Sequence, residues 1–136
     1  PGGYSYAAVK PIALRMVAEL CLDDPDMEVS GIGGVVQAQD AIEHLLLGAS
    51  TVQVCTGAML HGHAMVQGLI DGLHAFMEEN DFETVRSFVG KSLPYFTTHH
   101  DLVDKIVAQL VRRQLSKCGT DHPQFFQFLL GLGIGD

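Results

Sequence analysis

Two short apolar segments of this chain end in glycines or small residues, and each leads directly into a predicted helix. The first is residues 28–34 (EVSGIGG) and the second is residues 51–57 (TVQVCTG). Glycines let the backbone approach a ligand closely, and the next helix offers unpaired N–H groups and the positive end of its dipole. The spacing predicts two consecutive strand-helix units whose turns lie side by side and form one phosphate site.

Paired turns of this kind have a structural precedent and a simple alternative. In (β/α)8 barrels, the turns after the seventh and eighth strands hold a cofactor phosphate. The alternative is that Gly31, Gly33 and Gly34 are ordinary turn residues of an α/β protein without a ligand. The pattern leaves both interpretations open.

The hydrophobic periodicity predicts an α/β protein that ends in helices. A buried parallel strand is expected at residues 27–32, and a second strand at residues 51–55. Helices are expected at residues 11–21, 37–47, 61–78, 81–88 and 99–115, with a capping box at Thr98 and Asp101. A complete (β/α)8 barrel spans about 250 residues and has more strands than these two. If this is the whole polypeptide, its open sheet edges predict self-association, such as a barrel rebuilt from several copies.

Charge and cysteine content narrow the classes of partner and compartment. Eight Lys and Arg residues against sixteen Asp and Glu give a formal net charge of −8, which disfavours nucleic acid and anionic membranes as partners. The longest nearly apolar run, residues 125–134, is too short to cross a bilayer. Cys21, Cys55 and Cys118 are far apart in the chain, so we expect a reduced, cytoplasmic setting.

The histidines do not form a recognisable metal site. No carboxylate or cysteine falls at ligand spacing around His61 and His63 or around His99 and His100. His44 and His74 lie within predicted helices, where we expect packed or exposed side chains. We therefore expect no metal ligand and no catalytic residue in this chain.

Several longer words carry a resemblance to a known family. Residues 2–5 (GGYS), 8–15 (AVKPIALR), 30–34 (SGIGG) and 47–56 (LGASTVQVCT) closely resemble the end of the flavin domain of dihydropyrimidine dehydrogenases. Dihydroorotate dehydrogenases share the plan more loosely. The similarity extends to about Val103 and includes a segment that resembles the one following the barrel in the bacterial flavin-carrying subunit.

The resemblance implies a fold and a division of the chain. The fold would be the C-terminal part of a (β/α)8 TIM barrel, about two βα units, followed by a helical extension. Residues 1–89 would be the partial barrel, and residues 90–136 a loop, a helix and an apolar tail. Partners would be the remainder of the barrel or further copies of the chain in a homo-oligomer.

The resemblance also implies an FMN-dependent oxidoreductase that reduces the 5,6 double bond of uracil or thymine. Ile32, Gly33 and Gly34 would approach the FMN phosphate through backbone amides, and Cys55 and Thr56 would complete the pocket. Without a ligand, Cys55 would instead be a small buried residue at a strand end.

Two departures from the family pattern bear on activity. The loop before the first helix normally reads Gly-Gly-x-Ser-Gly, but Tyr6 replaces its last glycine and would take up space near the flavin. The family's proton-donating cysteine and its pyrimidine-binding residues come from segments that these 136 residues lack. The chain is therefore expected to be a fragment without turnover. The alternative function is a non-catalytic, self-assembling partial-barrel module, with or without a phosphate ligand.

Overall fold

The computed structural model describes residues 3–97 and 99–118, and contacts divide the chain into two units between Phe96 and Thr97. The helices and strands of the first unit are α1 (Lys10–Asp23), β1 (Ser30–Ile32), α2 (Ala38–Leu46), β2 (Thr51–Gln53), α3 (Thr56–His61) and α4 (Met65–Glu79). Three short 3-10 turns accompany them at Tyr6–Val9, Val85–Ser87 and Leu93–Tyr95. The second unit contains α5 (His99–Cys118). The expected barrel boundary at residues 89 and 90 stays a prediction.

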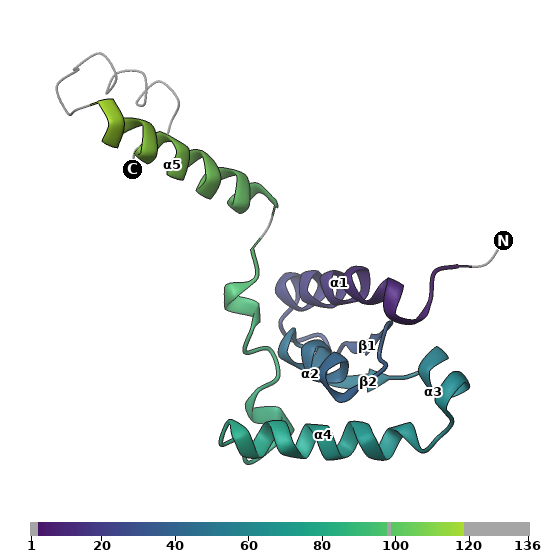
Figure 1. Cartoon of the computed structure of the whole chain (residues 1–136). Coiled ribbons are helices and arrows are strands. Elements are labelled where there is room, and N and C mark those ends of the chain that lie inside the picture. The colour runs from purple at the N-terminus through teal and green to yellow at the C-terminus, as the bar shows by residue number, and fades with distance from the viewer. Residues whose placement is uncertain (1–2, 98, 119–136) are drawn as a thin grey trace. The chain divides into compact units, whose positions relative to one another are not determined.

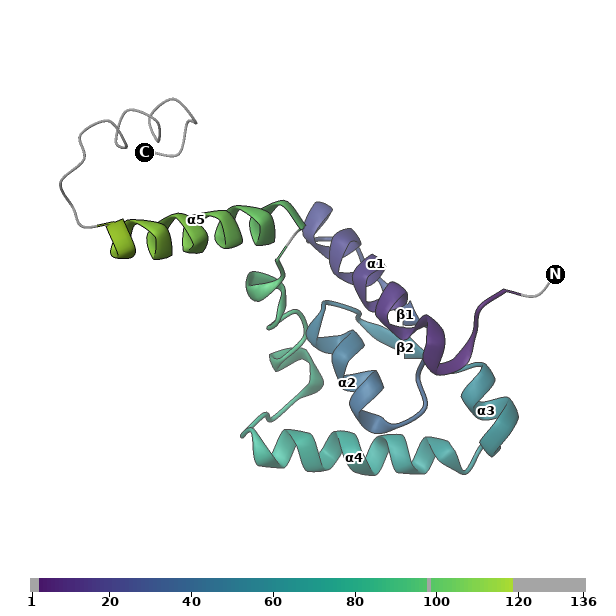
Figure 2. The same cartoon turned by 45° about the horizontal axis from the view of Figure 1, so that its top comes forward.

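The sheet consists of β1 and β2, which run parallel with Gly31 opposite Val52. Parallel neighbours need a crossover connection, and α2 supplies it. Helix α1 contacts β1, while α2 contacts β2, α1 and α4. Both views show α2 between α1 and α4 (Figures 1 and 2). The first unit is therefore a helix-rich, partial α/β domain.

Only one face of this sheet is covered. Gly31 is buried, whereas Ser30 and Ile32 on either side of it are exposed, because successive residues of a strand point to opposite faces. The expectation of a buried strand over residues 27–32 is thus wrong in two respects. The strand is shorter, and Ile32 is 51% exposed.

Two of the expected helices differ from the structure. The chain forms α3 and α4 instead of one helix over residues 61–78, because Gly62 adopts a φ of +71° and its N–H donates to the carbonyl of Ala58. Glycine adopts a positive φ readily, so the chain can leave the helix at this residue. Residues 81–88 contain only the turn Val85–Ser87, preceded by a positive φ at Asp81.

The core includes two groups of packed residues. Val17, Cys21, Val29 and Ala49 form a buried cluster between α1 and the sheet. In the segment that follows α4 in the chain, the ring of Phe88 is fully buried. It packs against two other aromatic rings, with centroid distances of 5.3 Å to Phe76 and 5.2 Å to Phe82. The apolar residues of α1 are only partly buried, since Ile12, Met16 and Leu20 remain exposed.

Helix α5 begins at His99, as expected, and continues to Cys118. Leu102, Ile106 and Leu110 recur along it and are exposed. The expected capping residue Thr98 and the apolar tail after residue 118 lie outside the described residues. Within the part of the chain that the structure describes, no helix has both the length and the apolar character needed to span a membrane.

Candidate functional site

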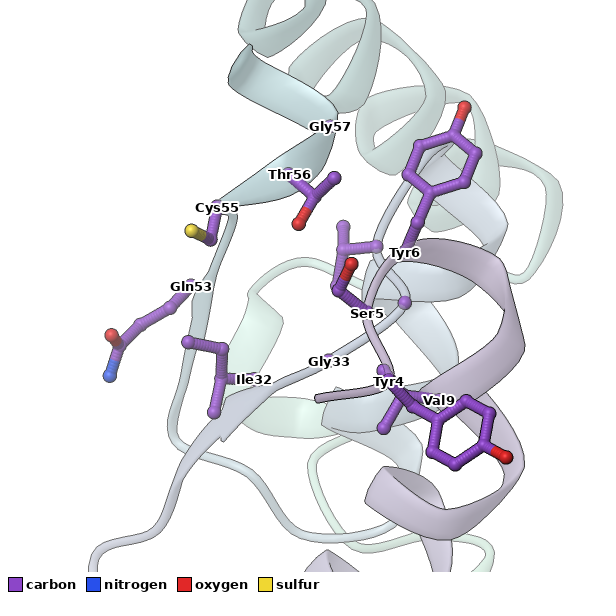
Figure 3. A pocket seen from close by; sticks show the side chains of 12 residues that line it. Tyr4, Ser5, Tyr6, Val9, Ile32, Gly33, Gln53, Cys55, Thr56 and Gly57 are labelled. Carbon is purple, nitrogen blue, oxygen red and sulfur yellow. The ribbon is translucent and has the colours of Figure 1, made fainter. Parts of the chain in front are cut away.

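The turns that follow β1 and β2 open onto one cavity of about 270 Å³ (Figure 3). The segment before α1 forms its remaining wall. The lining residues come from these three segments and are Tyr4, Ser5, Tyr6, Val9, Ile32, Gly33, Gly34, Val35, Gln53, Cys55, Thr56 and Gly57. Because the two strands are parallel neighbours, their carboxyl ends place both turns at the same edge of the sheet.

All five residues that the sequence singled out, Ile32, Gly33, Gly34, Cys55 and Thr56, line this cavity. Cys55 is exposed, so the interpretation of Cys55 as a small buried residue is wrong. Figure 3 shows the Thr56 side chain directed toward the space between the turns and the Cys55 thiol pointing away from it. Binding of a phosphate by these residues stays a prediction.

Gly33 and Gly34 are held by the first turns of α1. Their φ angles are +122° and +77°, a region that residues with a Cβ rarely adopt. A Cβ at Gly33 would lie 2.8 Å from the Cβ of Ala13, and one at Gly34 would collide with Lys10. The glycines are therefore needed for the turn to pass beneath α1, whether or not a ligand is present.

An ion pair fixes the far end of the same turn. The Nζ of Lys10 lies 2.7 Å from Asp40 Oδ1 and 2.9 Å from Glu43 Oε2. The other oxygen of Asp40 accepts hydrogen bonds from the backbone N–H groups of Val36 and Gln37, both at 2.9 Å. Gln37 and Asp40 form a capping box at the start of α2. The segment between Gly34 and α2 is thus fastened to both helices.

This arrangement shifts the pKa values of both charged partners. Burial acts to raise the pKa of Asp40, but the hydrogen bonds from Lys10, Val36 and Gln37 outweigh it and lower this pKa below its ordinary value. Hydrogen bonds to Asp40 and Glu43 raise the pKa of Lys10. Both groups are therefore charged at neutral pH, and the Lys10 ammonium is engaged by carboxylates.

His44 supports the turn from the side of α2. Its side chain is completely buried, and Nε2 lies 3.1 Å from the carbonyl oxygen of Gly33. Nδ1 has no hydrogen-bond partner among the described residues. From the sequence, His44 is expected to be a packed or exposed side chain of a helix. The contact with Gly33 is not predictable from the sequence, because no spacing rule links a helical histidine to a turn eleven residues earlier.

Tyr6 stands at the rim of the cavity. It has a φ of +60°, which is strained for a residue with a side chain. Its hydroxyl lies 2.9 Å from Nε2 of His61 at the end of α3. Tyr6 therefore joins the segment before α1 to the helix after the second turn.

The lining of the cavity is neutral. None of the twelve described residues that line it carries a formal charge, so an anion in the cavity would meet no charged lining side chain. Among residues 3–97 and 99–118, no group of three His, Cys, Asp or Glu side chains is placed to hold a metal ion.

Comparison with known proteins identifies relatives along most of the chain. A plant protein named dihydropyrimidine dehydrogenase (NADP(+)), chloroplastic, from Arabidopsis thaliana, is 47% identical over 124 residues, which cover 88% of this chain and 29% of the relative. The NAD-dependent dihydropyrimidine dehydrogenase subunit PreA of Escherichia coli strain K12 is 38% identical over 118 residues, covering 85% and 28%.

A third relative is named dihydroorotate dehydrogenase B (NAD(+)), catalytic subunit, and comes from Pyrococcus furiosus. It is 42% identical over 89 residues, which cover 65% of this chain and 29% of the relative. The chain spans under a third of the length of these relatives. The family model described as dihydroorotate dehydrogenase matches residues 1–77, more than half of the chain. The chain therefore belongs to the dihydroorotate dehydrogenase family.

Proposed function

We propose that this chain supplies the phosphate-binding part of a flavin site in an oxidoreductase, and that the flavin is FMN. The observation that supports this most directly is the meeting of the turns after β1 and β2 in one cavity, whose largely apolar lining includes Gly33, Gly34 and the hydroxyl-bearing Thr56. Ligand pockets commonly have volumes of about 300–1,000 Å³. A cavity of about 270 Å³ suits the phosphate end of FMN better than a complete flavin.

In this proposal the chain holds and orients the cofactor through its phosphate. The N–H groups of Gly33 and Gly34 and those at the start of α3 donate to the phosphate oxygens, and Ser5 and Thr56 add hydroxyl groups. The first N–H groups of a helix have no partner within that helix. Lys10 takes no part, because Asp40 and Glu43 engage its ammonium.

The substrate proposal rests on family membership and on the names of the relatives. Bound FMN would supply the hydride that reduces the 5,6 double bond of a pyrimidine such as uracil or thymine. The pyrimidine itself would be held by other parts of the whole protein. The present residues contribute affinity for the cofactor and its orientation.

We further propose that β1 and β2 are two strands of a TIM barrel. Two features of the first unit support this. Ile32 is exposed on the uncovered face of the sheet, and α1 presents Ile12, Met16 and Leu20 to solvent. Apolar groups in these positions are suited to burial against the remainder of the barrel or against a second copy of the chain.

The proposal is tested by titrating the chain with FMN and with riboflavin, which lacks the phosphate, while light scattering reports the mass of the assembly. We expect saturable binding of FMN and weaker binding of riboflavin. In a second measurement, Thr56→Glu places a negative charge among the phosphate-binding groups. A negative charge near the N-terminus of a helix stabilises that helix. The variant should therefore fold normally and lose FMN binding.

Thr84→Glu is the matched control, because Thr84 is exposed and lies outside the cavity. It should bind FMN like the unsubstituted chain. Absence of FMN binding by a folded, oligomeric chain would instead support the alternative of a self-assembling module without a ligand. Equal affinity for FMN and riboflavin would contradict the phosphate site.

A further inference from the structure

The buried imidazole of His44 makes its one described hydrogen bond to the turn that we propose as the phosphate site. Nε2 lies 3.1 Å from the carbonyl oxygen of Gly33. Gly33 and Gly34 line the cavity, whereas His44 does not. His44 therefore contacts the turn from behind, on the side that α2 covers.

The contact defines which nitrogen of His44 carries hydrogen. A carbonyl oxygen only accepts hydrogen bonds, so Nε2 must carry a hydrogen and donate it to Gly33. The contact thus places a hydrogen on Nε2, the nitrogen that faces the carbonyl oxygen of Gly33.

The packing around the ring leaves room for an imidazole at this point of the sheet. A Cβ at Gly31 would lie 2.8 Å from Nδ1 of His44 and 3.1 Å from the Cβ of Ala49. An apolar side chain in this space would avoid the unpaired buried nitrogen. The polar contribution of the imidazole in this structure is its hydrogen bond to Gly33.

That hydrogen bond determines where the next N–H points. In a trans peptide the C=O of one residue and the N–H of the following residue point in opposite directions, and the chain contains no cis peptide among its described residues. Because the Gly33 carbonyl points toward His44, the N–H of Gly34 points away from His44. Gly34 also lines the cavity.

We propose that His44 is a positioning residue, which presents the Gly34 N–H to the phosphate of the ligand by fixing the Gly33–Gly34 peptide. The inference rests on the proposed function. His44 touches neither ligand nor reacting atoms, and its effect passes entirely through one peptide group.

The test compares FMN and riboflavin binding in three variants of the full chain. His44→Leu removes the donor and replaces the imidazole by an apolar side chain of similar size. His44→Gln carries an amide N–H group that can replace Nε2. His74→Leu is the matched control, because His74 is exposed on α4 and lies outside this cavity. Circular dichroism checks that each variant folds, and ¹⁵N NMR of the unsubstituted chain reports the tautomer of His44.

We expect His44→Leu to weaken FMN binding about tenfold, the scale of one hydrogen bond to a charged group. Riboflavin binding should be unchanged, and His44→Gln should restore most of the FMN affinity. NMR should show hydrogen on Nε2 of His44.

Three results would overturn the inference. A loss of FMN and riboflavin affinity by the same factor in His44→Leu would mean that His44 only supports the fold. Hydrogen on Nδ1 in place of Nε2 would remove the donor on which the inference depends. Absence of FMN binding by the unsubstituted chain would overturn the proposed function, and the inference with it.

Discussion

The ammonium of Lys10 and the carboxylate of Asp40, 2.7 Å apart, join the first turn of α1 to the first turn of α2. The glycine turn of the candidate site runs between these two helices. Asp40 also accepts the N–H groups of Val36 and Gln37, so one carboxylate closes the ion pair and caps the helix. The stability of the candidate site is therefore tied to the charge of Asp40.

Acid should weaken the fold through Asp40. Its pKa is lower in the folded chain than the ordinary value near 3.8, so its contribution to stability is present above about pH 4 and is lost as pH falls through the folded pKa. The pKa of Lys10 is raised above 10.5 in the folded chain. The contribution of Lys10 to stability is therefore present below pH 10.5 and is lost as pH rises through this raised pKa. Urea unfolding between pH 2.5 and 7 measures the acid side.

The Asp40→Ala variant should be less stable by about 2–3 kcal/mol at pH 7, because it loses a helix cap and leaves Lys10 with one partner fewer. Asp40→Asn is the matched variant, since it keeps the shape and removes the titration. Its stability should vary less with acid than that of the unsubstituted chain. An identical acid dependence in both proteins would contradict the role of Asp40.

Two glycines with similar φ angles separate backbone strain from packing. Gly34 (φ +77°) lies against Lys10, whereas a Cβ at Gly62 (φ +71°) would meet no atom within 4 Å. Gly62→Ala should cost about 1–3 kcal/mol from the backbone conformation alone, since φ +71° with ψ −179° is a region used almost only by glycine. Gly34→Ala should cost at least about 3 kcal/mol, since a collision with the start of α1 is added. Equal losses in urea unfolding would show that α1 moves aside freely.

Much of the fold is predictable from the sequence, because hydrophobic periodicity indicates helices and strands and glycines indicate the turns between them. The β-branched residues Thr51, Val52 and Val54 indicate the second strand. The glycines after Ile32 indicate the turn that follows the first strand. The same periodicity hides the break at Gly62, because Met65 and Leu69 continue the helical spacing that begins near His61. A single positive φ does not alter that spacing.

The parts of the site that sequence reasoning missed are contacts between separate elements. Gln37 caps α2 together with Asp40, yet Gln is not among the residues preferred at this position. The hydrogen bond from His44 to Gly33 leaves no periodic trace. Such contacts depend on how α2 packs on β1, which local propensities do not specify.

Among the aromatic residues that the structure describes, Phe88 should be the most costly to truncate. Its side chain is fully buried and lies within 5.3 Å, centroid to centroid, of the Phe76 and Phe82 rings. Phe88→Ala should lower the free energy of unfolding by about 3–5 kcal/mol. Phe82→Ala should cost less, because Phe82 is half-buried. Thermal unfolding of both variants measures the difference, and a larger loss in Phe82→Ala would contradict this description of the core.

Replacing Tyr6 by glycine should change ligand affinity more than stability. The substitution relieves a left-handed residue, worth about 1–2 kcal/mol, and removes an exposed hydrogen bond to His61 worth about 0.5–1.5 kcal/mol. These effects nearly cancel. Because Tyr6 lines the cavity, removing its ring should open the rim and raise the affinity for FMN in fluorescence titrations.

Tyr6→Phe distinguishes the ring from the hydroxyl at this rim. It keeps the ring and the strained backbone but loses the bond to His61, so it should be slightly less stable and bind FMN like the unsubstituted chain. A fall in FMN affinity in Tyr6→Gly, with Tyr6→Phe unchanged, would mean that the ring contacts the ligand. Tyr6 would then be part of the binding surface. If its ring obstructed the ligand, removing the ring would raise the affinity for FMN and would not lower it.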